Sequence, residues 1–236
     1  MIGVLFDLDG TLFDHARAAR SGVTRFMSEL RHRLDPDEDE PAFQARWYRV
    51  TEHWMDRYLA GEMSLVEHQV ARMREILGEP GLYEAEALSV FDRYRVAYRQ
   101  HWQLFPDVER CLHGLEGIPL GILTNGAVEP QNEKARKTGL SAMVDVLVTS
   151  GELGVSKPSP RAFEAACERL QLPPERCLYV GDRLDVDARG ACGAGLMGVW
   201  LNRGSRDRAE DVPTFSNLNE FSGWFQRRFG EVAGTS

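Results

Sequence analysis

Residues 2–12 read IGVLFDLDGTL, an apolar run that leads into two aspartates one residue apart. The apolar run is typical of a buried strand, so Asp7 and Asp9 fall at its carboxyl end. An open parallel α/β sheet places its reactive groups at that end of its strands. One aspartate there could cap a following helix, but two of them, with Gly10 and Thr11 directly behind, favour a metal site, a phosphate site or both.

The composition indicates a globular, acidic protein. Its 236 residues are 43% hydrophobic and 27% charged, with a formal net charge of −8. This charge argues against binding of a nucleic acid polymer, which needs a basic face, but not against a small anionic substrate, since a local field can oppose the net charge. The sequence contains no apolar run of about 18 residues, so we expect no membrane-spanning helix. The N-terminus does not resemble a signal peptide.

The cysteines do not form a metal-binding pattern. None belongs to a CxxC pair, and their flanks are apolar, so we expect four buried small side chains rather than zinc ligands or disulfides: Cys111, Cys167, Cys177 and Cys192. Reduced cysteines favour a cytoplasmic protein.

The hydrophobic pattern changes twice along the chain. Residues 15–101 predict four helices, around 23–30, 43–59, 64–77 and 84–101, and no convincing strand. Ser64 and Glu67 form a capping-box pattern at the start of the third. The residues from 102 onward alternate instead between helices and strands. We expect strands at 118–123, 144–148, 177–180 and 198–201. We expect helices at 108–115, at 131–138, from Ser159-Pro160, at 186–194 and at 217–229.

This alternation predicts an α/β fold, a doubly wound, Rossmann-like parallel sheet with helices on both faces. We therefore expect residues 1–14 and 102–236 to form an α/β core, and residues 15–101 to form an inserted all-helical domain.

Polar side chains follow three further predicted strands. Thr124 and Asn125 can donate hydrogen bonds to an oxyanion, although an ordinary turn could contain the same residues. Lys157, held by a following proline next to a helix start, can offer a fixed positive charge. Asp182 is followed by two more aspartates, Asp185 and Asp187, and three carboxylates near a strand end suggest a divalent cation.

Taken in order, these four sites resemble the four motifs of the haloacid dehalogenase-like (HAD) superfamily, and in particular its phosphatases. The DLDGTL run is the most specific part, the match spans about residues 2–201, and the helical block resembles the family's type 1 cap. The resemblance implies a phosphomonoester hydrolase in which Asp7 is the nucleophile that forms an aspartyl-phosphate and Asp9 is the general acid and base. For Asp9 to act as an acid near neutral pH, its pKa must exceed the ordinary value of about 3.9.

The same resemblance implies a set of ligands. Thr124, Asn125 and Lys157 would hold the phosphoryl oxygens, since phosphoryl transfer depends mostly on positioning and charge stabilisation. Mg²⁺ would bind Asp7, the Asp9 backbone carbonyl and Asp182, with Asp187 as a further ligand or a support, and Asp185 as an exposed neighbour. The substrate would be a small phosphorylated metabolite, such as a sugar phosphate, a nucleoside monophosphate or a phosphoglycolate-like acid, and the protein a monomer or homodimer.

Several alternatives remain at this point. A phosphomutase would use the same acid, whereas a haloacid dehalogenase needs neither that acid nor a metal. A phosphonate-cleaving enzyme would need a lysine in the cap, and residues 15–101 contain none. A phospho-accepting signalling domain would not need Asp9 or a large helical block. A dinucleotide-binding module is disfavoured because Gly190, Gly193 and Gly195 lie within and after a predicted helix rather than before it.

Overall fold

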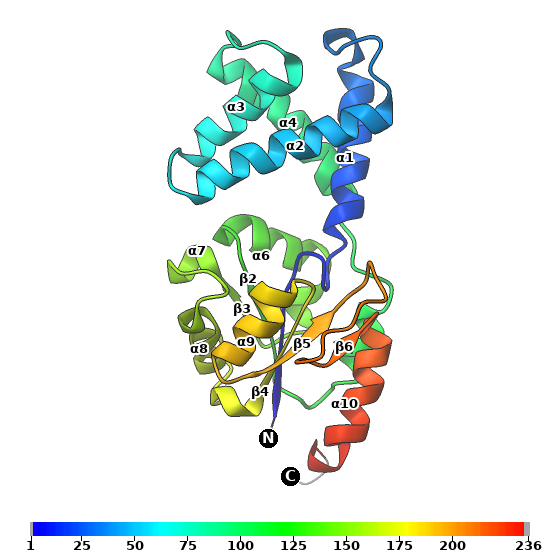
Figure 1. The fold of residues 1–236 in the computed structure, drawn as a ribbon, viewed down its shortest axis with the longest axis vertical. Helices are drawn as coiled ribbons and strands as arrows, with labels where there is room; N and C mark the ends of the chain where they lie inside the picture. Colours follow the sequence, from blue (N-terminus) through cyan, green and yellow to red (C-terminus); the bar gives the residue numbers. More distant parts are fainter. Residues whose placement is uncertain (1, 234–236) are drawn as a thin grey trace. The chain divides into compact units, whose positions relative to one another are not determined.

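The computed structural model describes residues 2–233, which form two compact units (Figure 1). One unit combines the residues up to Asp14 with those from Gln103 onward, and we call it the core unit. The other runs from His15 to Trp102, and we call it the helical unit.

The core unit is built on a sheet whose described strands are all parallel, in the order β3-β2-β1-β4-β5-β6. The strands are β1 (Gly3–Phe6), β2 (Leu120–Thr124), β3 (Val146–Thr149), β4 (Cys177–Gly181), β5 (Met197–Leu201) and β6 (Thr214–Phe215). The predicted doubly wound α/β fold is therefore confirmed. The sequence did not predict β6, because two residues are too few to show a strand period.

Helices cover both faces of this sheet. They are α5 (Val108–His113), α6 (Val128–Lys137), α7 (Ser150–Leu153), α8 (Pro160–Arg169), α9 (Arg189–Gly193) and α10 (Leu218–Ala233). Leu5 packs in one core cluster with Phe163 of α8. The next residue, Phe6, points to the opposite face and meets Phe221 of α10 edge-on at 6.0 Å, consistent with the positions of α8 and α10 in Figure 1.

The helix ends agree with most of the expected signals. Glu220 N donates to Asn217 Oδ1 (2.9 Å), which caps α10. Pro160 begins α8 as predicted, but the Ser159 hydroxyl makes no capping hydrogen bond, so that part of the prediction is wrong. The helix expected at 186–194 begins earlier, as a π-helical turn over Leu184–Ala188 that continues into α9.

The helical unit contains α1 (His15–Glu29), a 3₁₀ turn (Arg31–Arg33), α2 (Glu40–Leu59), α3 (Leu65–Leu77) and α4 (Glu84–Gln100). Its core is rich in aromatic side chains, including Phe26, Phe43 and Trp47. The capping box of Ser64 and Glu67 is confirmed at the start of α3.

Three of the cysteines, Cys111, Cys167 and Cys177, are buried as expected, but Cys192 is exposed, which corrects the prediction for that residue. Among the described residues, no helix combines the length and the apolar character needed to cross a bilayer.

Candidate active site

The predicted site residues of the core unit gather at one edge of the sheet. β1 lies between β2 and β4, so the strand order reverses on either side of β1. In open α/β sheets, ligands bind at such a switch point, at the carboxyl ends of the strands. Asp7 follows β1, Thr124 ends β2, and Asp182 follows β4.

A tight turn after β1 fixes the two aspartates. Gly10 N donates to Phe13 O (2.9 Å) and Phe13 N donates to Leu8 O (2.8 Å), which folds the chain back on itself. Gly10 has a φ of +94°, and a Cβ atom there would collide with the carboxylate of Asp182. A glycine is therefore required both by the backbone conformation and by the close approach of Asp182.

Lys157 is the central cation of the site. Its Nζ donates to Asp7 Oδ1 (2.6 Å), Asp187 Oδ1 (2.7 Å) and the hydroxyl of Tyr179 (2.6 Å), and the residue is only 4% exposed. Burial lowers the pKa of Lys157, but the charges of Asp7 and Asp187 more than offset this and raise it above its ordinary value. The lysine therefore stays charged, and each of the three donor positions of its ammonium group has an acceptor.

A third carboxylate lies beside the two that contact this lysine, which leaves an excess of negative charge. One oxygen from each of Asp7, Asp182 and Asp187 lies within 4.8 Å of the others. Burial raises the pKa of Asp7 to about 7; the charge of Lys157 lowers it, while the charges of Asp187 and Asp182 raise it. Burial, followed by the charge of Asp187, raises the pKa of Asp182 to about 6. A cluster of carboxylate oxygens that resist ionisation together fits a hard divalent cation such as Mg²⁺.

Asp187 differs from the other two carboxylates because both of its oxygens already have partners. Oδ1 accepts from Lys157, and Oδ2 accepts from the backbone N–H of Arg183 (3.0 Å). The π-helical turn directs this side chain back toward the end of β4. Asp187 thus orients Lys157 in this structure, and its role as a metal ligand stays a prediction. Asp185, by contrast, is exposed and pairs with Arg189, as expected.

The two predicted phosphate-binding residues after β2 have different partners. Thr124 Oγ1 is buried and accepts from Gln131 Nε2 (3.0 Å), so its own proton can be donated. Asn125 pairs with the backbone of Lys157, accepting from its N–H (2.9 Å) and donating to its carbonyl (3.0 Å). The Asn125 side chain therefore positions Lys157, and its direct contact with phosphate stays a prediction.

The sequence reasoning missed two side chains that contact Asp9. Lys134 Nζ lies 2.6 and 2.8 Å from its two carboxylate oxygens, and Gln131 Nε2 donates to Oδ2 (2.9 Å). Both residues belong to α6, which follows Asn125 closely in the chain. The sequence indicated that α6 begins near the carboxyl end of β2, but not which of its side chains face the turn after β1.

The sequence reasoning also missed Arg203, which contacts the backbone of the turn after β1. Its guanidinium forms two hydrogen bonds with Asp107 (both 2.9 Å) and one with Thr11 O (2.9 Å). Asp107 Oδ2 also accepts from Leu218 N at the start of α10 (2.8 Å). One partly buried ion pair thus fixes the turn after β1 to the end of the sheet and to the last helix.

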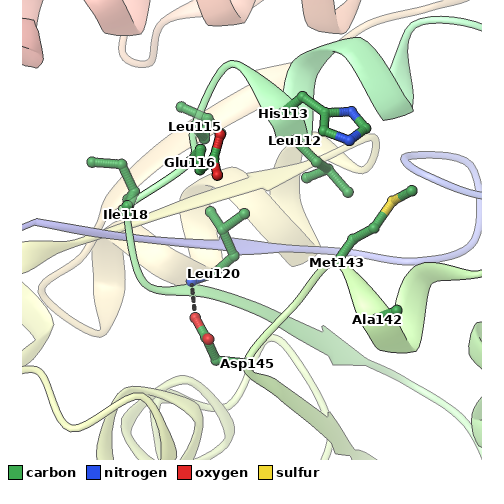
Figure 2. Close-up of a pocket in the computed structure, with 10 residues that line it drawn as sticks. Leu112, His113, Leu115, Glu116, Ile118, Leu120, Ala142, Met143 and Asp145 are labelled. Carbon is green, nitrogen blue, oxygen red and sulfur yellow. Dashed lines mark hydrogen bonds between the residues drawn. The ribbon is translucent and has the colours of Figure 1, made fainter.

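A separate cavity of about 260 Å³ lies away from this chemistry. Figure 2 shows it between α5 and the residues around Met143, where Asp145 accepts a hydrogen bond from the N–H of Leu120 (2.8 Å). Leu120 begins β2, so this cavity is at the amino ends of the strands, opposite the edge where such sheets bind ligands.

Comparison with known proteins agrees with this geometry. Residues 2–195 match the family described as haloacid dehalogenase-like hydrolase. The chain is 35% identical over 224 residues to a glyceraldehyde 3-phosphate phosphatase of Methanopyrus kandleri, covering 90% of this chain and 91% of that protein. It is 29% identical to a phosphoserine phosphatase of Thermus thermophilus, covering 86% and 89% of the two chains.

A solved structure of similar fold is that of YfnB from Bacillus subtilis, a HAD-hydrolase bound to magnesium. Its TM-score is 0.74 at 25% identity, covering 94% of this chain and 97% of that one. A 2-haloacid dehalogenase of Pseudomonas syringae has a TM-score of 0.69, also at 25% identity, covering 97% of this chain and 100% of that one.

Proposed function

Since the chain belongs to the haloacid dehalogenase-like hydrolases, we propose that it hydrolyses phosphomonoesters of small metabolites through an aspartyl-phosphate on Asp7. The observation that carries this proposal is the buried carboxylate of Asp7 at the switch point of the sheet, 2.6 Å from Lys157, with a second carboxylate, Asp9, in the same turn.

In the first step, a carboxylate oxygen of Asp7 attacks phosphorus and the bond from phosphorus to the substrate oxygen breaks. Asp9 gives its proton to that oxygen, so an alcohol leaves rather than an alkoxide. A dehalogenase has no alcohol to protonate, and the presence of Asp9 therefore supports a phosphatase.

In the second step, the same carboxylate of Asp9 takes a proton from water. The water oxygen attacks phosphorus, the bond from phosphorus to Asp7 breaks, and inorganic phosphate leaves. Asp7 is again a carboxylate and Asp9 again holds a proton, which closes the cycle.

Charge stabilisation comes from the groups around Asp7. Lys157 would exchange one of its present acceptors for a phosphoryl oxygen, and Thr124 would donate to another. Asn125 would hold Lys157 in place or donate itself. Asp7, Asp182 and the backbone carbonyl of Asp9 would hold Mg²⁺, which would neutralise part of the charge of the phosphoryl group.

The substrate class follows from the relatives. Their names assign glyceraldehyde 3-phosphate and phosphoserine to two of them, and both are small phosphorylated metabolites. We extend only this class to the present chain, and we assign the choice among its members to the helical unit, acting as a cap domain.

The Asp7→Asn variant tests this proposal. We expect phosphate release from a panel of metabolite phosphates with MgCl₂ to fall by at least about 10³-fold, because no carboxylate remains to attack phosphorus. EDTA should abolish the release by the unsubstituted protein. The matched control is Asp185→Asn, which removes an exposed carboxylate and should retain full activity. Turnover by Asp7→Asn at the control's rate would refute the nucleophile assignment.

A further inference from the structure

Asp9 is held by two side chains from a single helix. Lys134 Nζ contacts Oδ1 at 2.6 Å and Oδ2 at 2.8 Å, and Gln131 Nε2 contacts Oδ2 at 2.9 Å. Both donors are buried, Gln131 with 3% and Lys134 with 7% of its surface exposed. Buried donors have few rotamers available, so the carboxyl group that they bind is also restricted in direction.

The local structure is arranged around these donors. Gln131 and Lys134 lie three residues apart on α6 and therefore share one face of the helix. A Cβ atom on Gly126 would lie 2.6 Å from Gln131 Nε2, so the glycine at that position gives the amide its room. The ammonium of Lys134 also lies 5.0 Å from the ring centroid of Phe13, which belongs to the same turn as Asp9.

Gln131 also links Asp9 to Thr124. Its amide nitrogen has two protons, and it lies within hydrogen-bond distance of both Asp9 Oδ2 (2.9 Å) and Thr124 Oγ1 (3.0 Å). The amide cannot be turned over, because its oxygen would then face the carboxylate. One side chain thus sets the spacing between the proposed acid and a proposed phosphate ligand.

We propose that Gln131 and Lys134 are positioning residues that hold the Asp9 carboxyl group in the direction needed to protonate the leaving oxygen; the inference rests on the function proposed above. An ion pair at the surface would contribute little to stability. This pair lies instead between a buried lysine and the carboxylate that the reaction uses. Its charge favours the ionised form of Asp9, so we assign to it the direction of the carboxyl group rather than its acidity, and Gln131 adds a second, uncharged contact to the same group.

A comparison of leaving groups tests the proposal. The quantity kcat/KM covers the steps up to release of the alcohol, so it depends on general acid catalysis when the leaving group is a poor one. The alcohol of an alkyl phosphate needs that proton to leave, whereas p-nitrophenyl phosphate releases p-nitrophenolate, which is stable as an anion. Asp9→Asn is the reference variant, and we expect it to lower kcat/KM for the alkyl ester by about 10²–10⁴-fold and for the aryl ester far less.

Lys134→Met should show the same selectivity to a smaller extent. We expect kcat/KM to fall by about 10- to 100-fold with the alkyl phosphate and by less than about 3-fold with the aryl phosphate. Gln131→Met should show a similar preference with an added loss on both esters, because Thr124 also loses a partner. Lys134→Arg, which can still donate to both carboxylate oxygens, should recover part of the alkyl activity.

The matched control is Arg136→Met, which removes an exposed positive charge from the same helix. It should behave as the unsubstituted protein with both esters. A cooperative thermal unfolding transition in each variant would show that the core unit is folded.

Equal losses on both esters in Lys134→Met, or no loss on the alkyl ester, would overturn the positioning role. If Asp9→Asn remains selective in that case, the proposed function stands. Activity in Asp7→Asn would instead overturn the proposed function itself.

Discussion

The two units each bury a cation, but in opposite surroundings. Lys157 of the core unit is 4% exposed and contacts two carboxylates and a phenol. Arg72 of the helical unit is 5% exposed and faces the rings of Trp47, Phe91 and Tyr94 at 5.5, 5.3 and 6.0 Å. Within the described residues, Arg72 has no carboxylate partner, and its hydrogen-bonded side-chain partner is the hydroxyl of Thr51 (2.8 Å).

The same burial has different consequences at the two positions. Burial lowers the pKa of Arg72, and the opposing effect of Tyr94 is too small to reverse this. In Lys157, two carboxylates reverse it and raise the pKa. The core unit thus places opposite charges together where chemistry is proposed. The helical unit surrounds its cation with aromatic rings, which pack against Arg72 but do not neutralise its charge.

The largest effect is expected for Lys157→Met. Removal of one partner of a buried ion pair leaves uncompensated charge and costs about 3–5 kcal/mol of unfolding free energy. Loss of a donor to the reacting phosphoryl group should lower kcat by at least about 10²-fold. Urea unfolding in EDTA and phosphate release with MgCl₂ measure the two effects.

The control for Lys157→Met is Arg161→Met, which removes an exposed positive charge from the nearby helix α8. It should change neither quantity. If the Lys157→Met protein is as stable as this control, the three carboxylates of the cluster do not need the positive charge of the lysine to be buried in the folded protein.

Much of the core unit could be predicted because its signals are local. Apolar runs located the strands, and the residues directly after them, Asp7, Thr124 and Asp182, come together at the edge that a parallel sheet dictates. Lys157 could be predicted as a fixed charge, since a proline and a helix start follow it in the sequence.

The partners of these residues could not be predicted in the same way. Contacts of Asp9 with Gln131 and Lys134 join positions more than 120 residues apart, and a helical pattern does not say which side chains of α6 face the turn. The use of Asn125 to hold the backbone of Lys157 likewise depends on how two loops meet. Pairing between loops is a property of the tertiary fold, and local sequence patterns do not contain it.

His68, on the same helix as Arg72, makes the stability of the helical unit depend on pH. It is 2% exposed, and neither ring nitrogen has a hydrogen-bond partner among the described residues. Burial, followed by the charge of Arg72, lowers its pKa from 6.5 to about 4. The unfolded chain therefore gains a proton below pH 6.5 while the folded protein does not, so stability is lost as the pH falls from about 6.5 to about 4.

At pH 5 this loss amounts to about 2 kcal/mol relative to pH 7. Urea unfolding of the helical unit within the full chain at the two pH values measures it, and His68→Leu should remove it. His32→Leu is the control, because that histidine is exposed in the 3₁₀ turn after α1 and its loss should leave the pH dependence unchanged. An identical pH dependence in His68→Leu and the unsubstituted protein would contradict the assignment.

The smallest effect is expected for Arg72→Met, although the charge it removes is buried as deeply as that of Lys157. The variant loses cation–π attraction, but it also relieves the desolvation of an unpaired charge, and Met fills a similar space. Thr51 keeps a partner, since its hydroxyl donates to Trp47 O (2.8 Å). We expect a loss of about 1 kcal/mol in urea unfolding at pH 7, against about 2–5 kcal/mol for Arg72→Ala, which leaves a cavity. A loss in Arg72→Met as large as in Lys157→Met would show that the aromatic rings stabilise a buried cation as effectively as carboxylates do.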